Sequence, residues 1–145
     1  MFPSNIRMGS KTTPIKKIKG LIARKGIMGQ SHSFSDIKKK WKVLIDAGMN
    51  KKDTAQTVLH EAVHQISDLH DINLKERQVE DLSNALVYSF TENTSVDELR
   101  SAISKIDSLK GLKLSDIQIT KLAKALKYIG AHNPKFMSTI KKMHK

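Results

Sequence analysis

Hydrophobic residues recur every three or four positions along most of the chain after residue 35. This spacing places them on one face of an α-helix. It predicts a first helix from about Ser35 to Ala47, with Trp41 on its apolar side, and a second from near Asn50 to about Leu69. No segment alternates apolar and polar residues for long enough to predict a strand.

Later helices begin at recognisable capping sequences. An oxygen-bearing side chain before a helix accepts a hydrogen bond from a backbone N–H group that has no partner within the helix, and a Glu or Gln three residues on can return the bond. The predicted starts are Asn73 with Glu76, Ser95 with Glu98, Ser115 with Gln118, and Asn133 with Pro134. The short connections between these helices predict antiparallel pairs.

An internal repeat covers much of this helical region. Residues Leu59–Phe90 align without a gap on Leu99–Gly130, at a shift of 40 positions. Ten of the 32 aligned pairs are identical: Leu59/Leu99, Ala62/Ala102, Ile66/Ile106, Leu69/Leu109, Leu74/Leu114, Gln78/Gln118, Leu82/Leu122, Ala85/Ala125, Leu86/Leu126 and Tyr88/Tyr128. Repeats of this length form stacked units, each too small to bury its own apolar face. The repeat favours a binding scaffold over an enzyme with a single pocket.

These patterns predict an all-α fold, a short solenoid-like array of α-hairpin repeats with five to six helices. The repeat domain is predicted over residues 34–145, with units at about 50–90 and 95–130. Residues 1–33 have little apolar periodicity and no acidic residue. They predict an extended basic arm, with one helical turn around Ile15–Arg24. The same composition is similar to that of an organelle transit peptide.

The composition narrows the classes of function. The chain has 145 residues and no Cys, which excludes a disulfide framework and a thiolate metal site. No apolar run approaches the length of a membrane span, so no membrane partner is expected. The net charge of +12 favours an anionic partner, most often nucleic acid.

The charge is unevenly distributed between the two repeat units. Residues 51–100 carry five basic and ten acidic side chains, whereas residues 101–145 carry ten Lys and two Asp. The acidic stretch would repel RNA and is predicted to meet neighbouring basic proteins. Its members are Asp68, Asp71, Glu76, Glu80 and Asp81.

Basic residues of the arm, of the segment before Trp41 and of the last two helices are the predicted RNA contacts. Cations at these positions would neutralise phosphates without reading bases. Trp41 itself could stack on a base, but its register with Ile37 and Leu44 favours a place in the core. The predicted RNA-binding residues are Arg7, Lys11, Lys16, Lys17, Lys19, Arg24, Lys25, Lys38, Lys39, Lys40, Lys121, Lys124, Lys127, Lys141 and Lys142.

The second helix of each unit resembles a known repeat family. The segments LKERQVEDLSNALVYSF, from Leu74, and LSDIQITKLAKALKYIGAHNP, from Leu114, share a polar cap, an L-x-x-A-L core and an aromatic residue. They are similar to octotricopeptide and heptatricopeptide repeats and to FAST-kinase-type helical repeats. That resemblance implies RNA as partner, and a place in mitochondria or chloroplasts, in some cases within an organelle ribosome. The small number of units argues against a long sequence-reading array.

One motif points to metal chemistry instead. Residues 60–64 read H-E-x-x-H, in which two His one helical turn apart bind zinc and the Glu activates water. His70 follows at the spacing of the third metzincin ligand, but Ser67 stands where that family has Gly. On a continuous helix, residues 60 and 70 lie about 15 Å apart along the axis and cannot share an ion.

Two further observations weigh against a zinc site in the sequence. The positions equivalent to His60, Glu61 and His64 in the second unit are Arg100, Ser101 and Ser104, which predicts a solvated polar face. The pattern also shows no sheet upstream of the motif. We therefore expect no catalytic residue, no metal ligand and no cofactor.

The sequence predicts a non-catalytic helical-repeat protein that binds RNA, ribosomal RNA in particular, as a structural component of a mitochondrial ribosome or similar particle. A cytoplasmic location is the alternative to the mitochondrial one. A protein–protein adaptor or effector is the second hypothesis. A zinc peptidase of the H-E-x-x-H type is the third.

Overall fold

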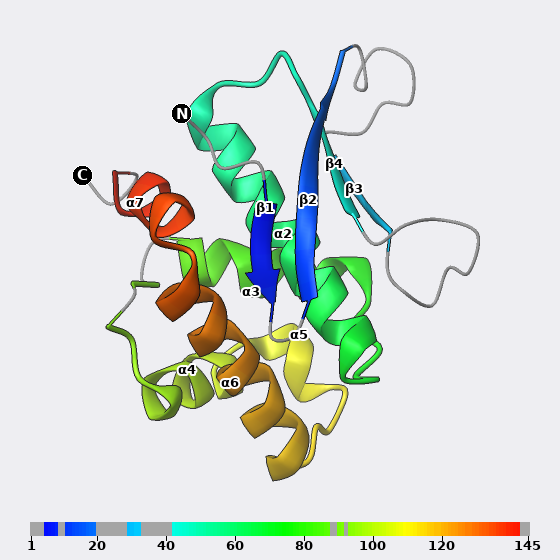
Figure 1. The fold of residues 1–145 in the computed structure, drawn as a ribbon. Helices are drawn as coiled ribbons and strands as arrows, with labels where there is room; N and C mark the ends of the chain where they lie inside the picture. The colour runs from blue at the N-terminus through cyan, green and yellow to red at the C-terminus, as the bar shows by residue number, and fades with distance from the viewer. Residues whose placement is uncertain are drawn as a thin grey trace.

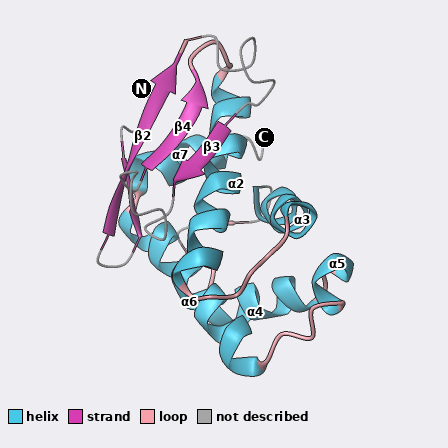
Figure 2. Cartoon of the chain, turned by 90° about the vertical axis from the view of Figure 1, so that its right-hand side faces the viewer, coloured by secondary structure: helices cyan, strands magenta, loops and turns pink. Residues whose placement is uncertain are grey.

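The computed structural model describes residues 5–8, 11–19, 29–32, 42–87, 90–91 and 93–142. A sheet lies at one end of the molecule with α2 (Lys51–Leu69) running along it (Figures 1 and 2). The helices between residues 96 and 132 extend away from the sheet, and the last helix returns to pack against α2. The strands are β1 (Asn5–Met8), β2 (Lys11–Ile18), β3 (Gly29–His32) and β4 (Lys42–Asp46). The other helices are α3 (Glu76–Val87), α4 (Val96–Ser104), α5 (Asp107–Lys110), α6 (Asp116–His132) and α7 (Pro134–Lys142).

The four strands form one mixed sheet in the order β1-β2-β4-β3. β1 pairs antiparallel with β2, β2 pairs parallel with β4, and β3 pairs antiparallel with β4. Alternate side chains are buried against the helices, as the period of two requires. They are Ile6, Met8, Thr13, Ile15, Val43 and Ile45. All of them except the polar Thr13 belong to the same hydrophobic core as α2 and α6.

The all-α prediction is therefore wrong. Residues predicted as an extended arm with a helical turn form β1, β2 and β3, and the predicted helix from about Ser35 to Ala47 is a strand where it is described, at Lys42–Asp46. In β1 and β2 only two alternate residues of each strand are buried, Ile6 and Met8 in β1 and Thr13 and Ile15 in β2. So short an alternation does not predict a strand from the sequence. These strands are stabilised by pairing with other strands of the sheet, which a local sequence pattern does not reveal.

Asn133 joins the sheet to the helices. The backbone N–H of Arg7 donates to Asn133 Oδ1 at 2.7 Å, and Asn133 Nδ2 donates to the Arg7 carbonyl at 2.9 Å. The same amide nitrogen reaches the carbonyl of Ile129, one turn back in α6. This side chain therefore pairs with the outer edge of β1, an edge that would otherwise expose its backbone groups.

The predicted helices after residue 50 are present, with one interruption. Capping boxes form at Ser95 with Glu98 and at Ser115 with Gln118, as the sequence indicates. The start predicted at Asn73 with Glu76 is wrong, because Asn73 lies in the preceding turn with positive φ and α3 begins at Glu76. The helix predicted from Ser95 is broken, because α4 ends at Ser104 and α5 is a separate single turn. Among the described residues no helix is both long enough and apolar enough to cross a membrane.

The repeat is visible in the backbone as well as in the sequence. Asn73 and Lys113, 40 positions apart, both have positive φ, at 61° and 51°. Two residues later, the backbone N–H groups of Lys75 and Ser115 donate to the side-chain oxygens of Gln78 and Gln118, at 2.8 and 2.9 Å. The two units therefore share the turn that begins their second long helix.

Candidate metal centre

The helix α2 carries the H-E-x-x-H motif on a continuous run of 19 residues. Asn50 caps its start, because the backbone N–H of Asp53 donates to Asn50 Oδ1 at 2.8 Å. The opposite side of the helix is held in the core by residues such as Leu59, Val63 and Ile66. His60 and His64 are four residues apart, so they lie one above the other on one face of the helix.

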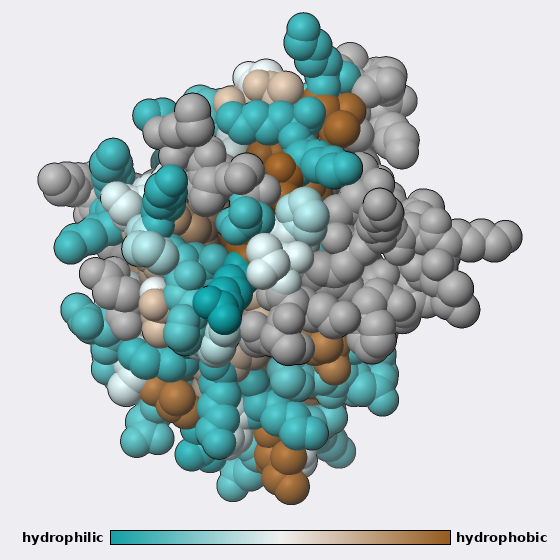
Figure 3. Space-filling model, in the orientation of Figure 1, coloured by the Kyte–Doolittle hydropathy of each residue, from teal (hydrophilic) through white to brown (hydrophobic). Residues whose placement is uncertain are grey.

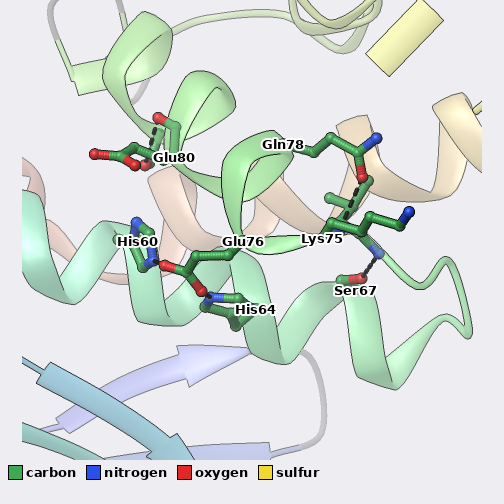
Figure 4. A network of polar contacts seen from close by, with 9 residues as sticks. His60, His64, Ser67, Lys75, Glu76, Gln78 and Glu80 are labelled. Carbon is green, nitrogen blue, oxygen red and sulfur yellow. Dashed lines mark hydrogen bonds and ion pairs between the residues drawn. The ribbon is translucent and has the colours of Figure 1, made fainter. Parts of the chain in front are cut away.

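The turn after α2 brings α3 back antiparallel to it. Asp71 and Asn73 adopt positive φ in this turn. The hydroxyl oxygen of Ser67 accepts a hydrogen bond from the backbone N–H of Leu74 at 2.8 Å, which ties the end of the turn to α2. As a result Glu76, the first residue of α3, faces the two histidines from the neighbouring helix (Figure 4).

The Glu76 carboxylate lies between the two imidazoles. His60 Nε2 is 2.6 Å from Oε1, and His64 Nε2 is 2.7 Å from Oε2. The two rings are in edge contact, with centroids 4.9 Å apart. The histidine side chains are mostly enclosed, at 17% and 23% exposure, whereas Glu76 is 70% exposed. The cluster is therefore open to solvent on the side of Glu76.

The electrostatics of the cluster keep its carboxylate ionised. Burial alone raises the pKa of Glu76. The charge interactions of the carboxylate with His64 and His60, together with the hydrogen bonds to the two imidazoles, outweigh burial and place the pKa of Glu76 below its ordinary value. Glu76 is thus an anion at neutral pH, which is the form that binds a metal cation.

The three side chains fit a divalent transition metal. One ligand atom from each of His60, His64 and Glu76 can be chosen so that all lie within 4.8 Å of one another. Two imidazole nitrogens and one carboxylate oxygen form the donor set of many catalytic zinc sites, in which three protein ligands leave the fourth position to water or substrate.

The structure contradicts two of the sequence-based arguments against a metal site, the solvated polar face and the lack of an upstream sheet. His60 and His64 do not form a solvated face, and Glu61 is buried. A sheet also precedes the motif, which the sequence pattern did not reveal. The third ligand is not His70, in agreement with the helical spacing. Glu76 was missed because it was assigned to the acidic, protein-facing stretch, and only the turn at 71–75 brings it to α2.

The predicted RNA-binding residues lie on several elements. Arg7, on β1, and the β2 residues Lys16 and Lys17 are exposed, as is Lys19 just beyond β2. On α6, Lys121 and Lys124 are exposed and Lys127 is half-buried, and Lys141 and Lys142 are exposed at the end of α7. Arg24, Lys25, Lys38, Lys39, Lys40 and the side chain of Lys11 lie outside the described residues, as does Trp41. Their role in binding RNA stays a prediction.

Comparison with protein-family models, with curated proteins and with solved structures finds no match for this chain.

Proposed function

We propose that this protein is a zinc-dependent hydrolase that cleaves peptide bonds. The observation that supports this proposal is the convergence of His60, His64 and Glu76 from two helices. The H-E-x-x-H arrangement on α2 is also the zinc-binding sequence of metallopeptidases. The proposal replaces the expectation of a protein without catalytic activity.

Each residue of the motif has a distinct part in this proposal. His60 and His64 bind the ion through Nε2, the atoms that already face Glu76, and Glu76 supplies the third ligand from α3. When bound, zinc activates a water molecule and polarises the carbonyl that is attacked. Glu61, adjacent to the first ligand, is the general base that accepts the proton of that water. Glu61 is buried, so bulk water has little access to it.

The metal is tested directly by elemental analysis and calorimetric titration with zinc. The expected result is one zinc ion per chain and a melting temperature that falls when a chelator removes it. Glu76→Gln should weaken zinc binding by at least tenfold, since the neutral amide is a poor ligand. The matched control is Asp116→Asn at the equivalent position of the second unit, which should leave zinc binding unchanged. Equal zinc affinity for both variants would refute the site.

The activity is tested with the zinc-loaded protein and unfolded casein as substrate. Cleavage should require zinc, and Glu61→Gln should abolish it while zinc binding and the melting temperature are kept. This result separates a base from a ligand. Cleavage that persists in Glu61→Gln, or in His64→Ala, would show that another group or a contaminating enzyme is responsible. His132→Ala, which removes an exposed histidine far along α6, is the control for general histidine effects.

RNA binding is a second candidate function, supported by the net charge and by exposed lysines such as Lys121 and Lys124. The affinity of the intact chain for single-stranded RNA should fall with salt, with a slope of about −0.7 per phosphate contact. Lys121→Glu with Lys124→Glu should weaken it, whereas Asp81→Ala should not. An undetectable affinity at about 50 mM salt would remove this candidate.

A further inference from the structure

The last repeat unit has an apolar groove that the described chain leaves uncovered. It lies between α4, α5 and α6, with a volume of about 190 Å³. Ile103, Leu109, Leu114 and Ile119 form its apolar lining. At the start of α6, Ile117 is 69% exposed, and Figure 3 shows hydrophobic surface at this end of the molecule.

The first unit shows why the groove is open. Leu74 and Val79, the equivalents of Leu114 and Ile119, are buried, whereas their counterparts are only partly buried. The first unit is covered by the second, since Gln78 Nε2 donates to the carbonyl of Ser108 in α5 at 3.1 Å. In a stack of repeats each unit covers the one before it, and the last unit needs a polar cap or another partner.

The described chain does not supply that cap. After α6 it turns at Asn133, and α7 packs back against α2 at the other end of the molecule (Figure 1). The second unit also exposes an apolar side chain where the first unit has a charge. Ile117 stands where the first unit has Arg77, which is 88% exposed as a solvated charge should be.

The groove has a cationic rim. Lys110 and Lys113 line it and are exposed. Of these, Lys110 is paired with Asp107 at 3.1 Å. Lys105 and Lys121, nearby in the same unit, are also exposed, and residues 101–145 carry ten Lys against two Asp. Apolar lining with a basic rim matches a ligand that is apolar on one face and acidic at its edges.

We propose that this groove binds an acidic amphipathic segment of a partner protein. Such a segment places aliphatic side chains at helical spacing into the groove and its carboxylates against Lys110 and Lys113. A nucleic acid would use the cations but gain nothing from Ile103, Leu114 and Ile119. A second copy of the chain would bring one lysine-rimmed groove against another, and like charges oppose that contact.

The test is selection from a library of random displayed peptides of about 16 residues, with the full chain carrying Glu61→Gln as bait, so that the peptides are not cleaved. Enriched peptides should carry several Asp or Glu and aliphatic residues spaced by three or four. A selected peptide should bind at least tenfold more weakly to Lys110→Glu with Lys113→Glu, and to Ile119→Ser, which changes an apolar residue of the lining. The control Lys51→Glu with Lys52→Glu, on exposed positions of α2, should bind as the parent does.

Several outcomes would overturn the proposal. They are the absence of any enriched peptide, enrichment of peptides without acidic residues, and affinity unchanged by the groove substitutions in variants with the parent's circular dichroism. Sedimentation that shows a dimer lost in Ile119→Ser would make a second copy the occupant instead. The groove lies outside the metal centre, so peptide binding should survive Glu76→Gln. Its failure and that of the zinc hydrolase are therefore distinguishable.

Discussion

The two repeat units place a basic and an acidic side chain at the same pair of positions. In the first unit His60 faces Glu76 at 2.6 Å, and in the second unit Arg100 faces Asp116 at 3.3 Å. Both pairs join the first helix of a unit to the first turn of its last helix. The repeat thus fixes where the two groups meet, and the residue types decide what the contact can do.

Arg100 cannot act as a metal ligand, because its guanidinium remains protonated and has no free lone pair. An imidazole can release its proton and offer nitrogen to a metal. The second unit also lacks the second imidazole, since Ser104 stands at the position of His64 and is the last residue of α4. The same scaffold therefore holds a surface ion pair in one unit and a potential metal centre in the other.

The units also differ in how completely they are packed. The first lies between the sheet and the second unit, and its core residues are fully buried. The second also contacts the sheet, through α6 and β1, but Leu114 and Ile119 are only partly buried, which leaves the groove open. An internal unit therefore gains stability from both neighbours, whereas a terminal unit keeps a face for binding.

The largest loss of stability is expected from a charged residue in the core of either unit. Leu82 and Leu122 are equivalent, and both are completely buried. Leu82→Asp or Leu122→Asp would place a carboxylate in the core without a partner and should reduce the free energy of unfolding by several kcal/mol. Thermal melting followed by circular dichroism measures this loss. If only Leu82→Asp is severe, the second unit contributes little to overall stability.

The comparison can be sharpened by building the metal centre into the second unit. Arg100→His, Ser104→His and Asp116→Glu together would reproduce the three ligands at equivalent positions. Zinc binding should rise from one ion to two per chain by elemental analysis and titration, with an intact circular dichroism spectrum. If the count remains at one, the end of α4 at Ser104 does not hold its histidine as the continuous α2 does.

The free energy of unfolding should depend on pH differently in the parent protein and in its Glu76→Gln variant. Because the pKa of Glu76 is lowered in the folded protein, its charged form stabilises the fold at pH values above its unfolded pKa of about 4.3. This stability is lost as the pH falls through the lower folded pKa. In the metal-free protein the variant should be the less stable at pH 6 and should approach the parent near pH 3. A constant difference between these pH values would contradict this assignment.

The smallest effect is expected at the start of α3. Lys75 occupies the position of Ser115, and its backbone N–H already donates to Gln78, so one half of a capping box is present. Lys75→Ser would add the hydroxyl acceptor that Ser115 provides and should raise the free energy of unfolding by about 0.5–1 kcal/mol. Ser115→Ala should lower it by about as much. Denaturant unfolding measures both, and Lys124→Ser on the exposed face of α6 is the control.

The sequence determined the helices after residue 50, their capping boxes and the repeat, because these depend on contacts within a few residues. Spacing alone placed His60 and His64 on one face of a helix and excluded His70. The sheet was not predictable in the same way. Its strands are short, the register of β2 with β4 joins residues nearly 30 positions apart, and Val43 and Ile45 fit a helical pattern as well as a strand.

Only the tertiary structure decided what the polar residues of the first unit do. Glu76 is 12 positions beyond His64, and a turn that needs positive φ at Asp71 and Asn73 brings it back to α2. The sequence contained each ligand but not their distance, since that distance depends on how two helices pack. The groove of the second unit depends on packing in the same way. The sequence contains its lysines and apolar residues, but only the structure shows that Leu114 and Ile119 are less buried than their equivalents in the first unit.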